Sequence, residues 1–128
     1  MNAKQFVSLV QTSPIEGYLT EQSNQKKDWL KSGKAILKKL AKELELPDSS
    51  YDIRVNPAGP AVSGDIILHG EWLYVHLSQY ACDCSNFMWR TCKGRKDYTG
   101  GANRWEQWEK LLDLPELATT MNKLRFHK

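Results

Sequence analysis

The sequence has few cysteines and no long apolar segment. Its 128 residues contain three cysteines, Cys82, Cys84 and Cys92, an odd number without the spacing of a disulfide framework. No stretch approaches the roughly 18 consecutive apolar residues that a membrane span requires. The first residues also lack the apolar centre of a signal peptide. We therefore expect a reduced, cytoplasmic protein that does not contact a membrane.

Recognisable catalytic and metal-binding motifs are absent as well. The chain carries neither a Walker loop nor a Gly-x-Gly-x-x-Gly fingerprint. His76 and the cysteines have side chains that suit zinc, but Cys92 follows Cys84 by eight residues, roughly 26 Å along an extended strand. This separation argues against one shared zinc site or a Cys92–His76 nucleophile pair. We therefore expect a non-enzymatic protein without a metal or a cofactor.

The sequence does contain enough apolar residues for a packed core and two concentrations of positive charge. Apolar residues make up 41% of the chain, and the length suits one domain over residues 1–128. The net charge is only +3, but residues 26–42 hold seven lysines against one aspartate, and residues 87–104 hold five basic residues against one aspartate. Such clusters attract phosphates, acidic proteins or anionic lipids. A lysine-rich helix face is also commonly just solvated.

Hydrophobic periodicity predicts helices at both ends of the chain. A short helix is expected over the first dozen residues and a longer one over residues 21–45, where apolar residues recur at three- and four-residue spacing. Near the C-terminus the same spacing predicts a short helix that contains Trp105, Trp108, Leu111 and Leu112, with Asn103 as its N-cap, and a further helix from Pro115.

The middle of the chain predicts four strands, at residues 51–55, 61–69, 71–78 and 86–93, because apolar and polar residues alternate there. Short connections favour an antiparallel meander. The fold class expected is α+β, with a four-stranded antiparallel meander sheet and one face packed by the N-terminal and C-terminal helices. Pairing Val75 with Trp89 and Leu73 with Thr91 matches the character of facing side chains.

The two sheet faces differ in chemistry. The expected apolar face faces the helices, and the other collects aromatic and charged side chains: Arg54, Asp65, Ile67, His69, Trp72, Tyr74, His76, Met88, Arg90 and Cys92. Aromatic rings mixed with arginine on a sheet can stack nucleobases. A covering helix or a second protomer would explain the same composition.

The segment from Lys93 to Arg104 combines glycines with positive charge. Two glycines precede the expected helix start, where free backbone N–H groups favour an anion. Four basic side chains would surround such a site. The candidate anion-binding or nucleic-acid-binding residues are therefore Lys93, Arg95, Lys96, Tyr98, Gly100, Gly101, Arg104, Arg90, Trp72 and Tyr74. A plain, solvated connection would tolerate the same residues.

These features predict a small binding protein that contacts nucleic acid or another phosphate-bearing partner through the basic, glycine-containing loop. The alternative is a protein–protein interaction module, or an inhibitor of a nucleic-acid-handling protein, with a protein as the partner. A third hypothesis, a small enzyme that acts on a phosphorylated metabolite, requires an enclosed pocket beside Gly100 and Gly101. Charge distribution does not choose between the first two.

Overall fold

The computed structural model describes residues 1–12, 20–56, 64–78, 86–97 and 99–126. Within them lie three α-helices, five strands and two short 3-10 helices. The helices are α1 (Ala3–Thr12), α2 (Thr20–Glu43) and α3 (Leu114–Phe126), with η1 (Asp48–Ser50) and η2 (Trp108–Leu112) as the 3-10 helices. The strands are β1 (Tyr51–Asn56), β2 (Asp65–Gly70), β3 (Leu73–Ser78), β4 (Asn86–Thr91) and β5 (Arg104–Gln107). The α+β class is confirmed.

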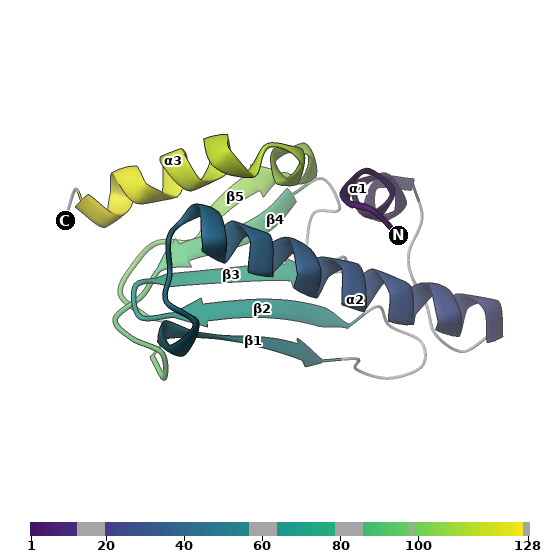
Figure 1. Cartoon of the computed structure of the whole chain (residues 1–128), viewed down its shortest axis with the longest axis horizontal. Coiled ribbons are helices and arrows are strands. Elements are labelled where there is room, and N and C mark those ends of the chain that lie inside the picture. Colours follow the sequence, from purple (N-terminus) through teal and green to yellow (C-terminus); the bar gives the residue numbers. More distant parts are fainter. Residues whose placement is uncertain (13–19, 57–63, 79–85, 98, 127–128) are drawn as a thin grey trace.

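The strands form one antiparallel sheet in the order β1-β2-β3-β4-β5, so that every strand pairs with its neighbour in sequence (Figure 1). The predicted register is confirmed, because Val75 lies opposite Trp89 and Leu73 opposite Thr91. The predicted strand count is wrong by one: the sheet has five strands, and the fifth is β5, which pairs with β4.

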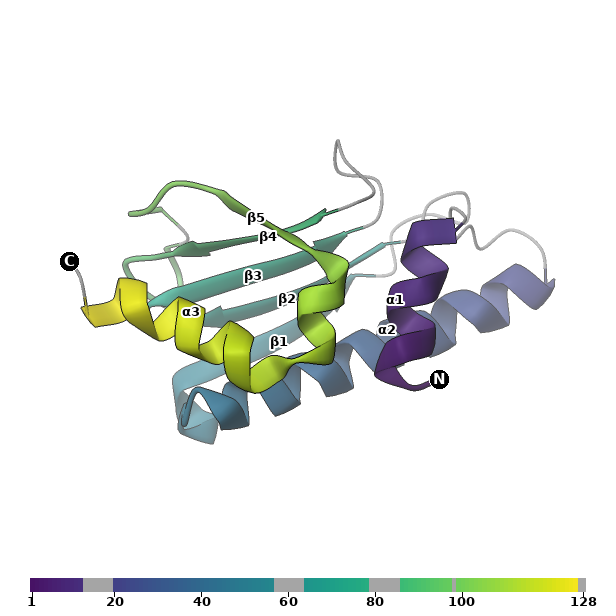
Figure 2. The ribbon, with the colours of Figure 1, turned by 90° about the horizontal axis from the view of Figure 1, so that it is seen from above.

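The helices lie together on one side of the sheet (Figure 2). Alternate side chains of β2, β3 and β4 point toward them and are buried, as are most apolar residues of α1, α2 and α3 and two residues of η2, Trp108 and Leu111. Helix α2 approaches the sheet closely at Gly33, where an added Cβ would lie 2.1 Å from Cδ1 of Ile66. A side chain at this position would have to displace the terminal methyl group of the buried Ile66.

The segment after Gly101 differs from the prediction. Residues 104–107 form β5 rather than the first turn of a helix, and the helical conformation begins only with η2 at Trp108. Trp105 and Trp108 are three residues apart, as on a helix face, yet Trp105 is exposed and Trp108 is fully buried. Asn103 is therefore no N-cap; its Oδ1 accepts a hydrogen bond from Nη1 of Arg90 at 3.0 Å.

Candidate anion-binding site

The connection between β4 and β5 is a structured hairpin loop. The backbone N–H of Lys93 donates to the Thr99 carbonyl oxygen at 2.9 Å. Within the loop, Gly94 and Asp97 form an antiparallel β-bridge. The Asp97 carboxylate accepts a hydrogen bond from the backbone N–H of Thr99 at 3.0 Å and another from the Thr99 hydroxyl. These hydrogen bonds hold the pKa of Asp97 below its ordinary value.

The tip of this loop is attached to the far edge of the sheet. Arg95 donates from Nη1 to the Ser49 carbonyl oxygen at 2.6 Å and from Nη2 to the Asp52 carboxylate at 2.8 Å. Nε2 of His69, on β2, lies 2.7 Å from the Gly94 carbonyl oxygen, which can only accept a hydrogen bond. The loop thus crosses the ends of the strands from β4 toward β1 (Figure 1).

The returning half of the loop packs tightly against the end of β4. A Cβ on Gly101 would lie 2.4 Å from Oγ1 and 2.7 Å from the carbonyl oxygen of Thr91, so only glycine allows this approach. Gly100 has a φ of +114°, a conformation that strains other residues. Arg90, on β4, also holds this segment in place, because its Nη2 donates a hydrogen bond to the Gly101 carbonyl oxygen.

Beside these glycines lies a hollow of about 620 Å³. Four parts of the chain enclose it: the β2–β3 turn, the end of β4, the returning half of the loop and the C-terminal turn of α3. Its lining residues are Glu71, Trp72, Thr91, Cys92, Lys93, Gly100, Gly101, Ala102, Arg104, Leu124 and Arg125.

Three basic side chains and one carboxylate line the hollow. Lys93, Arg104 and Arg125 supply the positive charge and Glu71 the negative charge, and all four are exposed. The Cζ atom of Arg125 lies 5.3 Å from the centre of the Trp72 ring. Cζ of Arg104 lies 5.8 Å from the ring centre of Trp89. The two rings attract these guanidinium groups and position them at the hollow.

Two polar groups in the wall are the buried indole nitrogen of Trp72 and the partly buried thiol of Cys92. The indole Nε1 of Trp72 has no hydrogen-bond partner in the part of the chain that the structure describes. The Cys92 thiol donates to the Gly70 carbonyl oxygen at 3.4 Å, and burial raises its pKa above the ordinary value. The thiol is therefore uncharged at neutral pH, while the indole N–H is a donor for which the described residues provide no acceptor.

This arrangement suits an anion with several oxygen atoms. Arginine guanidinium groups bind phosphate with paired N–H donors, and a lysine adds a point charge. The volume lies within the range of small-ligand sites.

The structure divides the predicted site residues between several places. Trp72, Lys93, Gly100, Gly101 and Arg104 line the hollow. Tyr74 and Arg90 lie on the other face of the sheet, where the Tyr74 ring packs edge-on against His69 at 5.1 Å. Arg95 is bound to Ser49 and Asp52, Lys96 is exposed, and Tyr98 is outside the described residues.

Two premises of the sequence prediction are wrong. Gly100 and Gly101 precede a strand, so no helix N-terminus faces them. Trp72 does not share a face with Tyr74, because it belongs to the turn before β3 and packs against the core beside α3. The prediction also missed Arg125, which reaches the hollow from α3; strand alternation and loop composition carry no information about a residue so distant in sequence.

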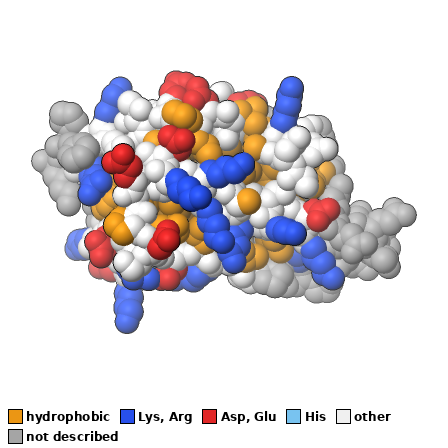
Figure 3. All heavy atoms as spheres, viewed as in Figure 1, with side chains coloured by type: hydrophobic (Ala, Val, Ile, Leu, Met, Phe, Trp, Pro, Cys, Tyr) orange, Lys and Arg blue, Asp and Glu red, His pale blue; other side chains and the backbone are white. Residues whose placement is uncertain are grey.

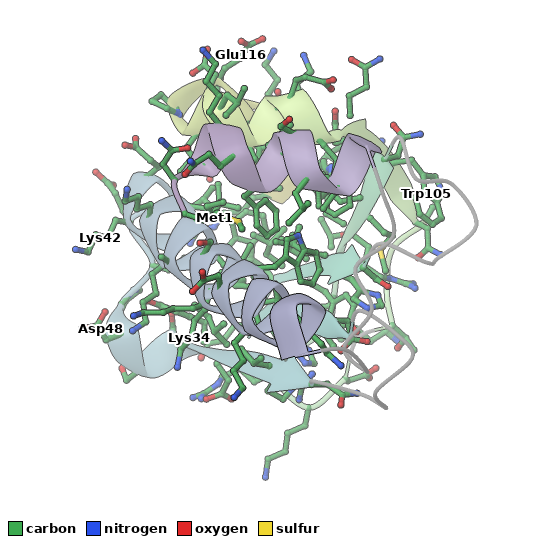
Figure 4. All side chains as sticks on the ribbon, turned by 90° about the vertical axis from the view of Figure 1, so that its right-hand side faces the viewer. Met1, Lys34, Lys42, Asp48, Trp105 and Glu116 are labelled. Atoms are coloured by element: carbon green, nitrogen blue, oxygen red, sulfur yellow. The ribbon has the colours of Figure 1, made fainter. Side chains whose placement is uncertain are left out.

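We call the sheet face opposite the helices the far face. It carries a second set of side chains that are exposed or partly exposed. Paired positions form a row across all five strands, consisting of Arg54, Ile67, His76, Met88 and Trp105. Trp105 is 46% exposed, and Figure 4 shows it on the side of the molecule away from α2. His76 Nε2 contacts the Asp65 carboxylate at 3.1 Å.

Among the described residues, no group of three or more His, Cys, Asp or Glu side chains is placed to hold a metal ion. No helix in the described ranges is long and apolar enough to cross a membrane. Cys82 and Cys84 lie outside those ranges. No family model, curated protein or solved structure matches the chain.

Proposed function

We propose that this protein is a non-enzymatic binding protein that holds a phosphate group of a nucleic acid in the hollow beside Gly100 and Gly101. The observation that carries the proposal is that Lys93, Arg104 and Arg125 line one hollow in which Glu71 is the single carboxylate among the residues that the structure describes. Three positive charges and one negative charge attract an anion, and a guanidinium group can bind a phosphate with paired N–H donors.

The wall of the hollow favours binding over catalysis. A nucleophilic cysteine needs a lowered pKa, whereas burial raises the pKa of the Cys92 thiol.

A nucleic acid is favoured over a free metabolite because the hollow is open to solvent at its charged rim. The three basic side chains are exposed, so a ligand held there continues into solvent, as a polymer does. Lys96 lies on the same loop as Lys93 and provides one further positive charge beside the path of the nucleic-acid strand. Such contacts position the backbone and do not read bases.

The proposal is tested by fluorescence anisotropy with labelled single- and double-stranded DNA and RNA at several salt concentrations. The variant Arg104→Gln/Arg125→Gln removes two charges and keeps most of each stem on its tryptophan ring. We expect affinity to fall with salt, and the slope of log K against log salt to fall by about 1.4–1.8 in the variant.

Lys4→Gln/Lys110→Gln is the matched control, since both lysines are exposed and neither lines the hollow. It removes the same charge, and we expect its slope to change less. Absence of binding at low salt, or equal slopes in variant and control, would contradict the proposal.

A second candidate function, protein–protein interaction, is favoured by the far face. An exposed tryptophan in a row with arginine and methionine has the composition of interface hot spots. If this candidate is correct, a partner protein that copurifies with the wild type is lost from Trp105→Ala and retained by Arg104→Gln/Arg125→Gln. Retention by Trp105→Ala would refute it.

A further inference from the structure

Helix α2 carries a straight row of lysines on its solvent side. The row consists of Lys27, Lys31, Lys34, Lys38 and Lys42, all of them exposed. At 3.6 residues per turn these positions fall within an arc of about 80°, and the row is about 22 Å long. Figure 3 shows basic side chains gathered in this row over α2, and Figure 4 shows Lys34 and Lys42 pointing away from the sheet.

The charge of this row is not neutralised by neighbouring side chains. None of the ion pairs found in the described part of the chain involves its lysines. Residues 26–43 contain only two carboxylates, Asp28 and Glu43, and helical geometry places both outside the arc. Lysines three or four residues apart repel one another on a helix.

The helix forms despite this repulsion because its other side is buried. Trp29, Leu37 and Leu40 are fully buried between α2 and the rest of the core. Packing therefore sets the position of the row, and the lysines contribute nothing to that packing. A row that is repulsive in the free protein becomes favourable when a polyanion lies along it.

The shape of the row favours a stiff linear polyanion. The row is long and narrow. A lipid surface is planar, and charges spread over a wider arc of the helix would contact it better. Apart from Ala35, the exposed positions of α2 between residues 27 and 43 are charged, so no apolar side chain is available to anchor in a bilayer. A straight row about 22 Å long matches about six base pairs of a duplex.

We infer that the lysine row of α2 binds the phosphate backbone of double-stranded nucleic acid. This inference rests on the proposed function for the chemistry of the partner but uses a different surface from the hollow. Because lysines act as point charges, the row contacts the phosphates along the duplex and not the base edges. The contact is therefore independent of sequence.

The test compares two triple variants of equal charge by anisotropy with a labelled 16-base-pair duplex and with a single strand of the same length. Lys31→Gln/Lys34→Gln/Lys38→Gln removes the centre of the row, and glutamine preserves helix propensity. Lys4→Gln/Lys110→Gln/Lys123→Gln removes three exposed lysines elsewhere. Circular dichroism is measured for both variants to check that they fold.

We expect the row variant to lose at least tenfold in duplex affinity and to reduce the slope of log K against log salt by about 2.7. The control should change both quantities much less, and the row variant should lose less on the single strand. Equal losses in the two triple variants would overturn the inference, because net charge alone would then explain binding. Row-dependent binding to vesicles containing phosphatidylserine, without binding to the duplex, would overturn it in favour of a lipid surface.

The hollow variant Arg104→Gln/Arg125→Gln separates the two proposals. If it loses nucleic-acid binding while the row variant retains it, the hollow stands as the binding site and the row inference fails. If only the row variant loses duplex binding, the row stands and the function proposed for the hollow fails.

Discussion

The close packing of Gly101 against the end of β4 predicts a large difference between two glycine substitutions in one loop. A Cβ on Gly101 would lie 2.4 Å from Oγ1 and 2.7 Å from the carbonyl oxygen of Thr91, whereas a Cβ on Gly94 would meet nothing within 4 Å. The backbone oxygen cannot rotate away, so Gly101→Ala must displace the loop. Gly94→Ala is therefore the matched control.

Overpacking of this kind costs about 1–3 kcal/mol. For a domain of this length, 1 kcal/mol corresponds to roughly 4 °C in Tm, so we expect Gly101→Ala to lower Tm by roughly 4–12 °C. Gly94→Ala should leave stability unchanged or raise it by up to about 1 kcal/mol, because alanine reduces the entropy of the unfolded chain. Thermal unfolding followed by circular dichroism, and urea unfolding followed by tryptophan fluorescence, measure both variants.

A third variant identifies the clashing atom. Thr91→Ala in the Gly101→Ala background removes Oγ1 but leaves the carbonyl oxygen 2.7 Å away, so it should recover little of the lost stability. Because Gly101 also lines the hollow, Gly101→Ala should weaken nucleic-acid binding and Gly94→Ala should not. Equal stability of Gly101→Ala and Gly94→Ala would refute this description of the loop.

Three further predictions concern single side chains. Arg95→Ala should cost no more than about 1 kcal/mol, as expected for an exposed ion pair, and should reduce nucleic-acid affinity less than Arg104→Gln; a larger loss of affinity would make Arg95 a ligand. Asp97 has a lowered pKa because of its hydrogen bonds to Thr99, so its contribution to stability is present near neutral pH and is lost as pH falls through its folded pKa. The stability difference between wild type and Asp97→Asn should therefore vanish in acid, and a difference that grows there would contradict the assignment. Trp105→Ala should change stability by about 0.5 kcal/mol or less, as at other exposed positions, whereas Trp108→Ala should cost about 3–5 kcal/mol; similar urea midpoints for the two variants would refute their placement.

The alternation of apolar residues was enough to predict the central hairpin. Leu73 and Val75 face Thr91 and Trp89 because shifting the register by one residue would turn the buried side chains toward the far face. The long helix α2 could also be predicted from the sequence, since a single apolar stripe determines which of its sides is buried.

The strand β5 could not be found in this way. Trp105, Trp108 and Leu111 recur at helical spacing, but Trp105 pairs with Met88 across the sheet while Trp108 enters the core. The four residues of β5 are too few to show alternation, and their conformation depends on pairing with β4. The role of Arg125 could not be predicted for the same reason, because it depends on tertiary structure. Arg125 reaches the hollow only because α3 ends beside the β2–β3 turn.

The proposed position of the phosphate in the hollow can be tested directly by NMR, through the tryptophan indole N–H signals of the ¹⁵N-labelled protein. Trp72 lines the hollow with a buried N–H that has no acceptor among the described residues, and Trp105 lies on the far face. During titration with a short oligonucleotide we expect the Trp72 signal to shift and the Trp105 signal to stay in place, with the shift abolished in Arg104→Gln/Arg125→Gln. A shift of Trp105 without a shift of Trp72 would contradict the proposed site.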